Sequence, residues 1–192
     1  MAIEIELKAW LDDPEAVAER LSRLGSLSRS FEKDDAYWQA DGTAVPGSGV
    51  RVRRERSIDA RGEARETALV TTKSKRVSDG IEVNDEREFA VSDAGLFEEL
   101  LCALGLREGT RKEKLGREWK VAGERPASAE ISLVAGLGWF LELEIIAADD
   151  GERTVGECRA ALLSLLEDLG VSAEKIEARS YASLLRARKG KS

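Results

Sequence analysis

Hydrophobic and polar residues alternate with a period of two in several parts of the chain, a pattern typical of β-strands whose two faces meet different surroundings. Seven segments show this alternation: residues 3–8, 50–54, 69–75, 81–91, 111–121, 129–134 and 140–146. Segments rich in glycine, proline, aspartate and serine, at 41–49, 59–65 and 123–128, predict loops between strands. The sequence therefore predicts at least seven strands.

Three longer segments have the periodicity and the end signals of α-helices. They run from Pro14 to Gly25, from about Asp93 to Gly105 and from Thr154 to Gly170, and a short charged helix follows from about Ser180 to Arg188. Asp13 caps the first helix, and Glu157 completes a capping box with Thr154 in the third. All three longer helices end in Leu-x-x-Leu-Gly.

The order of these elements repeats weakly. A strand with Glu-x-Glu, a helix ending in Leu-x-x-Leu-Gly and strands with paired bases occur from residue 4 and again from about residue 86. An internal duplication and the ordinary alternation of strands and helices both account for this order.

The polar faces of the strands carry charges of one sign in blocks. Carboxylates occupy the polar face at 3–8, 81–91 and 140–146, whereas bases occupy it at 50–54, 69–75 and 111–121. In an open sheet such faces lie in water. If the sheet closes with these faces inward, its interior is a polar tunnel and the helices cover the apolar outer faces. The pattern alone leaves both arrangements open.

The composition limits the chemistry. The 192 residues include no histidine, which excludes Ser-His-Asp triads, Cys-His dyads and histidine-ligated metals and leaves carboxylates, lysine and arginine. The net charge of -7 argues against nucleic acid as a partner. The charged N-terminus and the lack of a long apolar segment predict a cytoplasmic protein without membrane contact. Cys102 and Cys158 lie in leucine-rich helical segments and are expected to be buried free thiols.

Several short motifs follow one another along nearly the whole chain. They are Glu4-Ile5-Glu6-Leu7-Lys8, Asp35-Ala36-Tyr37, Arg51-Val52-Arg53, Thr71-Thr72-Lys73, Glu82-Val83-Asn84-Asp85-Glu86-Arg87-Glu88-Phe89, Lys112 with Lys114, Gly136-Leu137-Gly138-Trp139-Phe140, Glu142-Leu143-Glu144 and Ser180-Tyr181. In this order they resemble the CYTH family, the class IV adenylyl cyclases and thiamine triphosphatases also called triphosphate tunnel metalloenzymes. The Glu-Val-Asn-x-Glu and Leu-Gly-Trp-Phe-Leu-Glu-x-Glu runs are most similar to the class IV adenylyl cyclase branch.

The resemblance implies an α+β fold over residues 1–192 as a single domain: a closed antiparallel β-barrel (triphosphate tunnel) with helices packed on the outside. It also implies that the bases bind a triphosphate and that the carboxylates bind Mg²⁺ or Mn²⁺. The expected phosphate ligands are Lys8, Arg51, Arg53, Lys73, Lys112 and Lys114, and the first four are the expected catalytic residues. The expected metal ligands are Glu4, Glu6, Glu142 and Glu144, followed by Glu86 and Glu88.

Two positions depart from the family pattern. Ser132 stands where the family usually has an aspartate, and a hydroxyl is a poorer Mg²⁺ ligand than a carboxylate. Glu130 has the same strand parity and is a candidate replacement. The family often has Lys-x-Arg at the lysine pair, so the stronger phosphate ligand is either Lys112 or Lys114.

Three functions are compatible with such a tunnel. An adenylyl cyclase converts ATP to cyclic AMP and pyrophosphate. A triphosphatase hydrolyses tripolyphosphate, thiamine triphosphate or a nucleoside triphosphate, and a non-catalytic protein binds a polyphosphate or nucleotide without turnover. The branch resemblance favours the cyclase. The expected partner is a nucleotide triphosphate or an inorganic or organic polyphosphate, and a homodimer is compatible with the cyclase branch.

Overall fold

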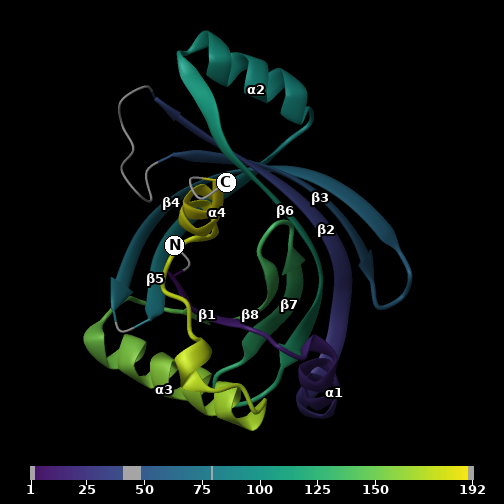
Figure 1. Ribbon diagram of the computed structural model, residues 1–192, viewed down its shortest axis with the longest axis vertical. Coiled ribbons are helices and arrows are strands. Elements are labelled where there is room, and N and C mark those ends of the chain that lie inside the picture. The colour runs from purple at the N-terminus through teal and green to yellow at the C-terminus, as the bar shows by residue number, and fades with distance from the viewer. Residues whose placement is uncertain (1–2, 41–48, 79, 190–192) are drawn as a thin grey trace.

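The computed structural model describes residues 3–40, 49–78 and 80–189, so the predicted loop at 41–49 lies outside it except for Gly49. In the described chain, eight antiparallel strands close into a barrel in the order β1-β5-β4-β3-β2-β6-β7-β8 (Figure 1). The strands are β1 (Ile3–Trp10), β2 (Gly25–Ala40), β3 (Val50–Asp59), β4 (Ala64–Ser78), β5 (Ile81–Val91), β6 (Leu106–Val121), β7 (Ala127–Val134) and β8 (Gly138–Ala147). The predicted closed barrel is confirmed.

The ring of strands has an internal two-fold order. If β1, β2, β3 and β4 change places with β5, β6, β7 and β8, respectively, every pair of neighbouring strands in the barrel stays the same. Each half consists of a strand, a helix and three further strands. This arrangement is the one expected from an internal duplication.

The alternation pattern missed β2. Its Lys33 and Asp35 side chains are buried inside the barrel, whereas Glu32 on the opposite face is exposed. Asp34 also lies on the outer face and pairs with Arg111 there, at 2.8 Å from carboxylate oxygen to Nε. Because both faces of β2 carry charges, a search for alternating apolar and polar residues cannot recognise it.

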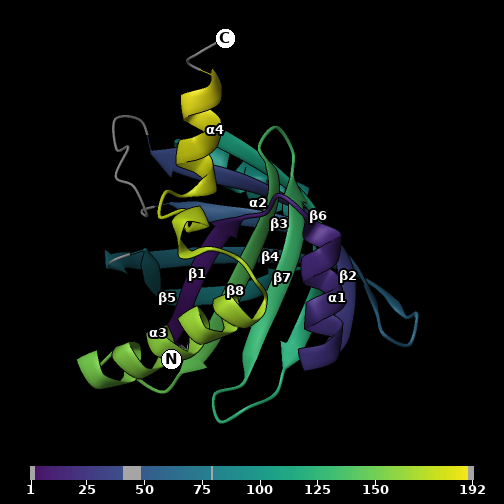
Figure 2. The same ribbon diagram turned by 60° about the horizontal axis from the view of Figure 1, so that its bottom comes forward.

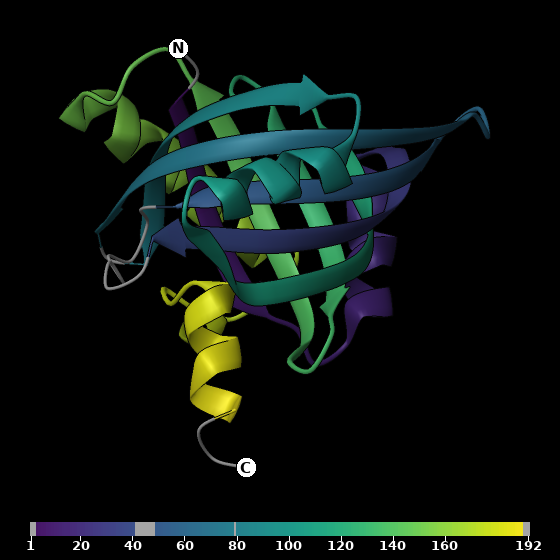
Figure 3. The same cartoon turned by 90° about the horizontal axis from the view of Figure 1, so that it is seen from above.

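Four α-helices lie outside the strands in the described ranges: α1 (Pro14–Leu24), α2 (Ala94–Ala103), α3 (Glu152–Asp168) and α4 (Tyr181–Lys189), with a short 3₁₀ helix, η1 (Ala173–Lys175). The largest apolar core lies between α1, α3 and the outer faces of β1, β7 and β8. It is formed by residues such as Ile5, Leu7, Leu21, Ile131, Leu143, Leu162 and Leu166. A smaller core lies under α2, which crosses the outer face of the sheet (Figure 3).

Two details of the helices differ from the prediction. α3 begins at Glu152 after the cap position Gly151, because the Asp149 carboxylate accepts a hydrogen bond from the Gly151 N–H at 2.8 Å and starts the turn earlier. The expected capping box at Thr154 is therefore wrong. Cys158 is buried as expected, but Cys102 is exposed, since α2 turns Leu101 toward the sheet and leaves the neighbouring face in solvent.

α4 stands over one end of the barrel (Figures 1 and 2). The segment leading to it is fixed to β1, where Ile176 forms a bridge with Ala9 and the Glu177 N–H donates to the Lys8 carbonyl at 2.7 Å. No helix within residues 3–40, 49–78 and 80–189 is both long and apolar enough to cross a membrane.

The position of the core outside the barrel predicts which leucines stabilise the fold. Leu162 of α3 is fully buried, whereas Leu96 of α2 is 65% exposed. Leu162→Ala should lower the free energy of unfolding by about 2–5 kcal/mol, because it leaves a cavity in the core. Urea denaturation followed by circular dichroism would measure this loss. Leu96→Ala is the control and should change the free energy by less than about 0.5 kcal/mol; equal losses in the two variants would contradict the assignment of the core.

Candidate functional site

The polar faces of the strands line a cavity of about 740 Å³ inside the barrel. Its walls include all the predicted phosphate and metal ligands whose side chains the structure describes: Glu4, Glu6, Lys8, Arg51, Arg53, Glu86, Glu88, Lys112, Lys114, Glu142 and Glu144. Lys73 lies in β4 with its backbone opposite Glu86, and its side chain is outside the described part. Residues from all eight described strands, many of them far apart in sequence, thus meet in one polar lumen.

Asp35 organises the base-rich wall. It lies in β2 directly between Arg53 of β3 and Lys112 of β6. Arg53 donates two hydrogen bonds to its carboxylate, at 2.6 and 3.0 Å, and the Lys112 Nζ lies 2.8 Å from Oδ2. Burial alone would raise the pKa of Asp35, but the charges of Lys112 and Arg53 outweigh burial and hold its pKa well below the usual range. Asp35 therefore stays ionised and orients two predicted phosphate ligands.

Arg51 connects the bases to the acids of β5. Its Nη2 donates to Glu86 Oε1 at 2.7 Å and to Thr71 Oγ1 at 2.9 Å, and it lies 3.4 Å from Glu88 Oε2. The Thr71 hydroxyl donates to Glu88 at 2.9 Å. Two of the predicted metal ligands thus pair with a predicted phosphate ligand.

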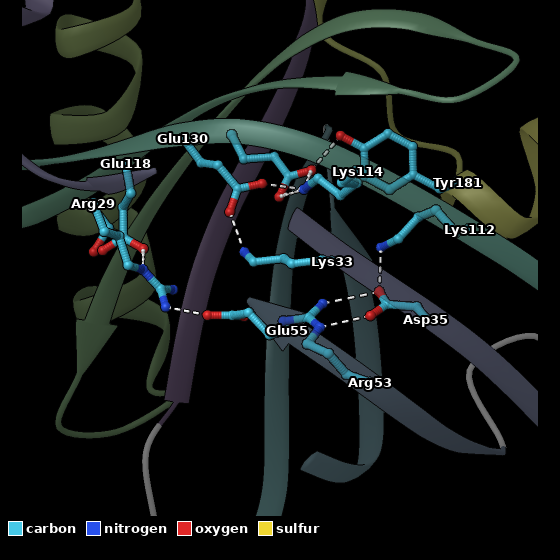
Figure 4. A network of polar contacts seen from close by, with 12 residues as sticks. Arg29, Lys33, Asp35, Arg53, Glu55, Lys112, Lys114, Glu118, Glu130 and Tyr181 are labelled. Carbon is cyan, nitrogen blue, oxygen red and sulfur yellow. Dashed lines mark hydrogen bonds and ion pairs between the residues drawn. The ribbon is translucent and has the colours of Figure 1, made fainter. Parts of the chain in front are cut away.

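Lys114, on the same strand as Lys112, is the centre of a second network (Figure 4). Its Nζ pairs with Glu130 and lies 2.9 Å from both oxygens of Glu142. Glu130 also accepts a hydrogen bond from Lys33 at 2.5 Å, and Glu142 accepts one from the Tyr181 hydroxyl. Burial would raise the pKa of Glu130, but Lys114 and Lys33 lower it, so the carboxylate is ionised. Burial lowers the pKa of Lys33, and Glu130 only partly offsets this effect.

Tyr181 brings α4 into contact with this network. The ammonium groups of three lysines surround its ring, at 4.9 Å for Lys8, 5.0 Å for Lys112 and 5.3 Å for Lys114. Burial and the charge of Glu142 raise the pKa of Tyr181 well above its usual value, so the phenol stays protonated and donates to the carboxylate. The electron-rich ring face lies beside three positive charges, which stabilises their grouping.

Carboxylates face one another across the acidic wall. Glu6 is directly opposite Glu82 on one side and Glu144 on the other, and Glu130 stands between Glu118 and Glu142. Like charges in such cross-strand pairs destabilise a sheet unless positive charge lies beside them. Lysines supply it for Glu130 and Glu142, and hard oxygen donors of this kind also fit Mg²⁺ or Mn²⁺. In the described residues, no three carboxylates converge on a single point.

The structure distinguishes Glu130 from Ser132. The Ser132 side chain is fully buried, packed beside Gly116 and opposite Phe140, and its Oγ is without a hydrogen-bond partner in the described chain. Glu130 lies in the charged network two residues earlier in β7. Of the two alternatives, Glu130 therefore has the geometry for a role in the polar site.

The sequence analysis missed several residues of the lumen. They are Arg29, Lys33, Glu55 and Glu118; Tyr181 was quoted within a family motif but was given no role in the site. Arg29 and Lys33 belong to β2, the strand that was not recognised, and Glu55 lies beyond the predicted end of β3. Glu118 has the same strand parity as Lys112 and Lys114, which was the available signal.

Comparison with known proteins agrees with this geometry. The family model described as CYTH domain matches residues 2–181. "Putative adenylate cyclase MJ0240" of Methanocaldococcus jannaschii is 26% identical over 185 residues, which cover 95% of this chain and 98% of that protein. The solved structure of the PH1819 protein from Pyrococcus horikoshii has a TM-score of 0.78 at 23% identity and covers 96% of this chain and 99% of its own. The Hippeastrum protein HpAC1, described as having a dominant triphosphatase activity, has a TM-score of 0.65 at 13% identity, with 97% and 96% covered.

The Glu177 carboxylate, in the segment that leads to α4, predicts a pH dependence of the free energy of unfolding. Hydrogen bonds from the Arg179 side chain outweigh burial and, with the Arg179 N–H and the Trp10 indole, lower the pKa of Glu177 to about 2. An unfolded glutamate titrates near about 4.3. The ionised group therefore stabilises the fold above that pH, and its contribution disappears as the pH falls toward about 2. The difference in free energy of unfolding between the wild type and Glu177→Gln should shrink over this range in urea titrations; a constant difference would contradict the assignment.

Proposed function

The chain belongs to the CYTH family, and from this premise we propose that its 192 residues form one triphosphate tunnel that acts as a divalent-metal-dependent enzyme. The favoured reaction is the conversion of ATP to cyclic AMP and pyrophosphate. The observation that carries the proposal is the closed lumen of about 740 Å³, in which bases from β1, β3 and β6 face carboxylates from β1, β5 and β8. A soluble ligand with several phosphates is the class of molecule that this charge distribution suits.

The proposed phosphate ligands divide into two kinds. The planar guanidinium groups of Arg51 and Arg53 can each bind two phosphate oxygens and so orient the polyphosphate. Lys8, Lys112 and Lys114 act as mobile point charges beside them, and Lys73 of β4 completes the proposed set. Both Lys112 and Lys114 are paired with carboxylates in the lumen, so both are available to a phosphate only in exchange for these partners.

The proposed metal ligands are the carboxylates of the acidic wall. Glu4, Glu6, Glu142 and Glu144 line the lumen from two neighbouring strands, with Glu86 and Glu88 nearer to Arg51. A bound Mg²⁺ or Mn²⁺ would neutralise phosphate charge between these carboxylates and the ligand and polarise the phosphoryl oxygens. The chain itself contributes positioning and positive charge, which are the main requirements of phosphoryl transfer.

The cyclase and triphosphatase reactions differ in the nucleophile. In the cyclase, the ribose 3′ oxygen forms a bond to the α-phosphorus, the bond to the bridging oxygen breaks, and pyrophosphate leaves. In the triphosphatase, a water oxygen attacks the terminal phosphorus instead. The name of the Methanocaldococcus relative supports the cyclase, and the activity described for the Hippeastrum protein supports the triphosphatase as a second candidate.

Product analysis separates these candidates. The purified protein is incubated with ATP, tripolyphosphate or thiamine triphosphate and Mg²⁺ or Mn²⁺, and the products are resolved by anion-exchange chromatography. We expect cyclic AMP and pyrophosphate from ATP. Orthophosphate as the product would assign the chain to the triphosphatases, and binding of ATP without turnover would show a non-catalytic binder.

Substitution of one wall residue tests the site. Glu6→Gln keeps the side-chain shape and removes one carboxylate from the acidic row, so kcat should fall by about 100-fold, or about 2.7 kcal/mol of transition-state stabilisation. Glu113→Gln is the matched control, because Glu113 is exposed on the outer face of β6, and its kcat should stay within about twofold of the wild type. Full activity of Glu6→Gln, or equal losses in both variants, would disprove the tunnel site.

A further inference from the structure

Lys33 and Glu130 form a buried ion pair in the lumen that the family motifs do not include. The Lys33 Nζ lies 2.5 Å from Glu130 Oε2, and the other side of the Glu130 carboxylate pairs with Lys114. Lys114 in turn holds both oxygens of Glu142 at 2.9 Å. Figure 4 shows Lys33 extending toward Glu130 from the side of the lumen that carries Asp35 and Arg53. Two lysines and two glutamates thus form one continuous chain of contacts.

The strand pairing of the barrel brings these four residues together. Lys33 and Lys114 are directly opposite each other in β2 and β6, and Glu130 and Glu142 are directly opposite each other in β7 and β8. Each pair of like charges is tolerable only because the other pair lies against it. The side chains of Lys33 and Lys114 are 6% and 2% exposed, so bulk water solvates neither charge. The arrangement holds two cations and two anions side by side away from bulk solvent, where they attract one another more strongly than in water.

The pairing satisfies the charges but occupies the groups that a ligand would need. A polyphosphate in the lumen would compete with Glu130 and Glu142 for the lysines, and a divalent cation would compete with the lysines for the glutamates. Either ligand alone would leave buried charges of one sign without partners, which is costly. Both ligands together would give each lysine a phosphate and each glutamate a cation.

We propose that Lys33 is an additional phosphate ligand and Glu130 an additional cation ligand of the tunnel, and that their ion pair couples the two binding events by exchanging partners. The proposal rests on the proposed function and adds that the two ligands bind cooperatively. Each ligand binds weakly alone and strengthens the binding of the other. Such coupling is reciprocal, so the same factor applies to both affinities. Lys33 suits the exchange because its ammonium is a mobile donor, and the Phe31 ring 3.9 Å away stabilises it while it changes partners.

The coupling predicts that removing the charge of Glu130 raises the affinity for a polyphosphate. Glu130→Gln removes the competitor for Lys33 and Lys114, so tripolyphosphate in metal-free buffer should bind about tenfold more tightly than to the wild type. Isothermal titration calorimetry with a chelator present measures this change. A merely structural role of Glu130 predicts unchanged or weaker binding. Glu118→Gln is the control, since Glu118 is the next carboxylate in the same row but contacts Arg29 and Lys120 instead; its gain should be less than about threefold.

The reverse substitution gives an independent measurement. Lys33→Met keeps an unbranched side chain, removes the ammonium and releases Glu130 from one lysine. Mn²⁺ without any phosphate should therefore bind about tenfold more tightly, as measured by the electron paramagnetic resonance signal of free Mn²⁺. In the same variant, tripolyphosphate binding in metal-free buffer should weaken. Circular dichroism verifies that each variant is folded, and if Glu130→Gln does not fold, the Lys33→Met measurement decides.

The outcomes separate this inference from the proposed function. Wild-type protein that binds tripolyphosphate, together with Glu130→Gln and Lys33→Met variants that show no gain for either ligand, would overturn the coupling and leave the tunnel function in place. Wild-type protein that binds no tripolyphosphate with or without Mn²⁺ would overturn both. Opposite gains in the two variants would establish the exchange.

Discussion

Charge compensation inside the closed barrel is the constraint on which the rest of the structure depends. Buried carboxylates and bases cost several kcal/mol each to remove from water, and only contact with opposite charge recovers that cost. The lumen meets this requirement by placing Asp35 between Arg53 and Lys112 and Lys114 between two glutamates. Because the interior of the barrel is given to charges, the apolar core lies outside it, between the strands and the helices. α1, α2 and α3 are therefore as necessary to the fold as the strands themselves.

Much of this arrangement was predictable from the sequence. Strand parity and the sign of the charges identified the lumen-facing residues of β1, β3, β5, β6 and β8, since two faces of different polarity leave a period of two in the sequence. β2 was missed because Glu32 and Asp34 on its outer face are as polar as Lys33 and Asp35 on its inner face. The contact between Tyr181 and Glu142 could not be predicted from the alternation of residues, because it depends on where α4 packs rather than on any local periodicity.

The departure at Ser132 has a structural counterpart in the same strand. Ser132 lies between Gly116 and Phe140, and its hydroxyl has no hydrogen-bond partner in the described chain. Glu130 lies where Lys33 and Lys114 can neutralise it. The acid that β7 contributes to the charged network is thus Glu130, one inward-facing position before Ser132. Lys33, which lies on β2, supplies one of the two positive charges that offset the burial of this carboxylate.

The ring closes by pairing its first and last strands, Ile3 with Ala147 and Trp10 with Phe140. Contacts so distant in sequence carry a large loop-closure entropy and form late and slowly during folding. β1 contributes Glu4 and Glu6 and β8 contributes Glu142 and Glu144, so the acidic wall is incomplete until these two strands pair. The closed ring and the complete site therefore depend on the same strand pairing. A chain that lacked β8 would leave β1 and β7 with unpaired strand edges, which are surfaces that favour aggregation.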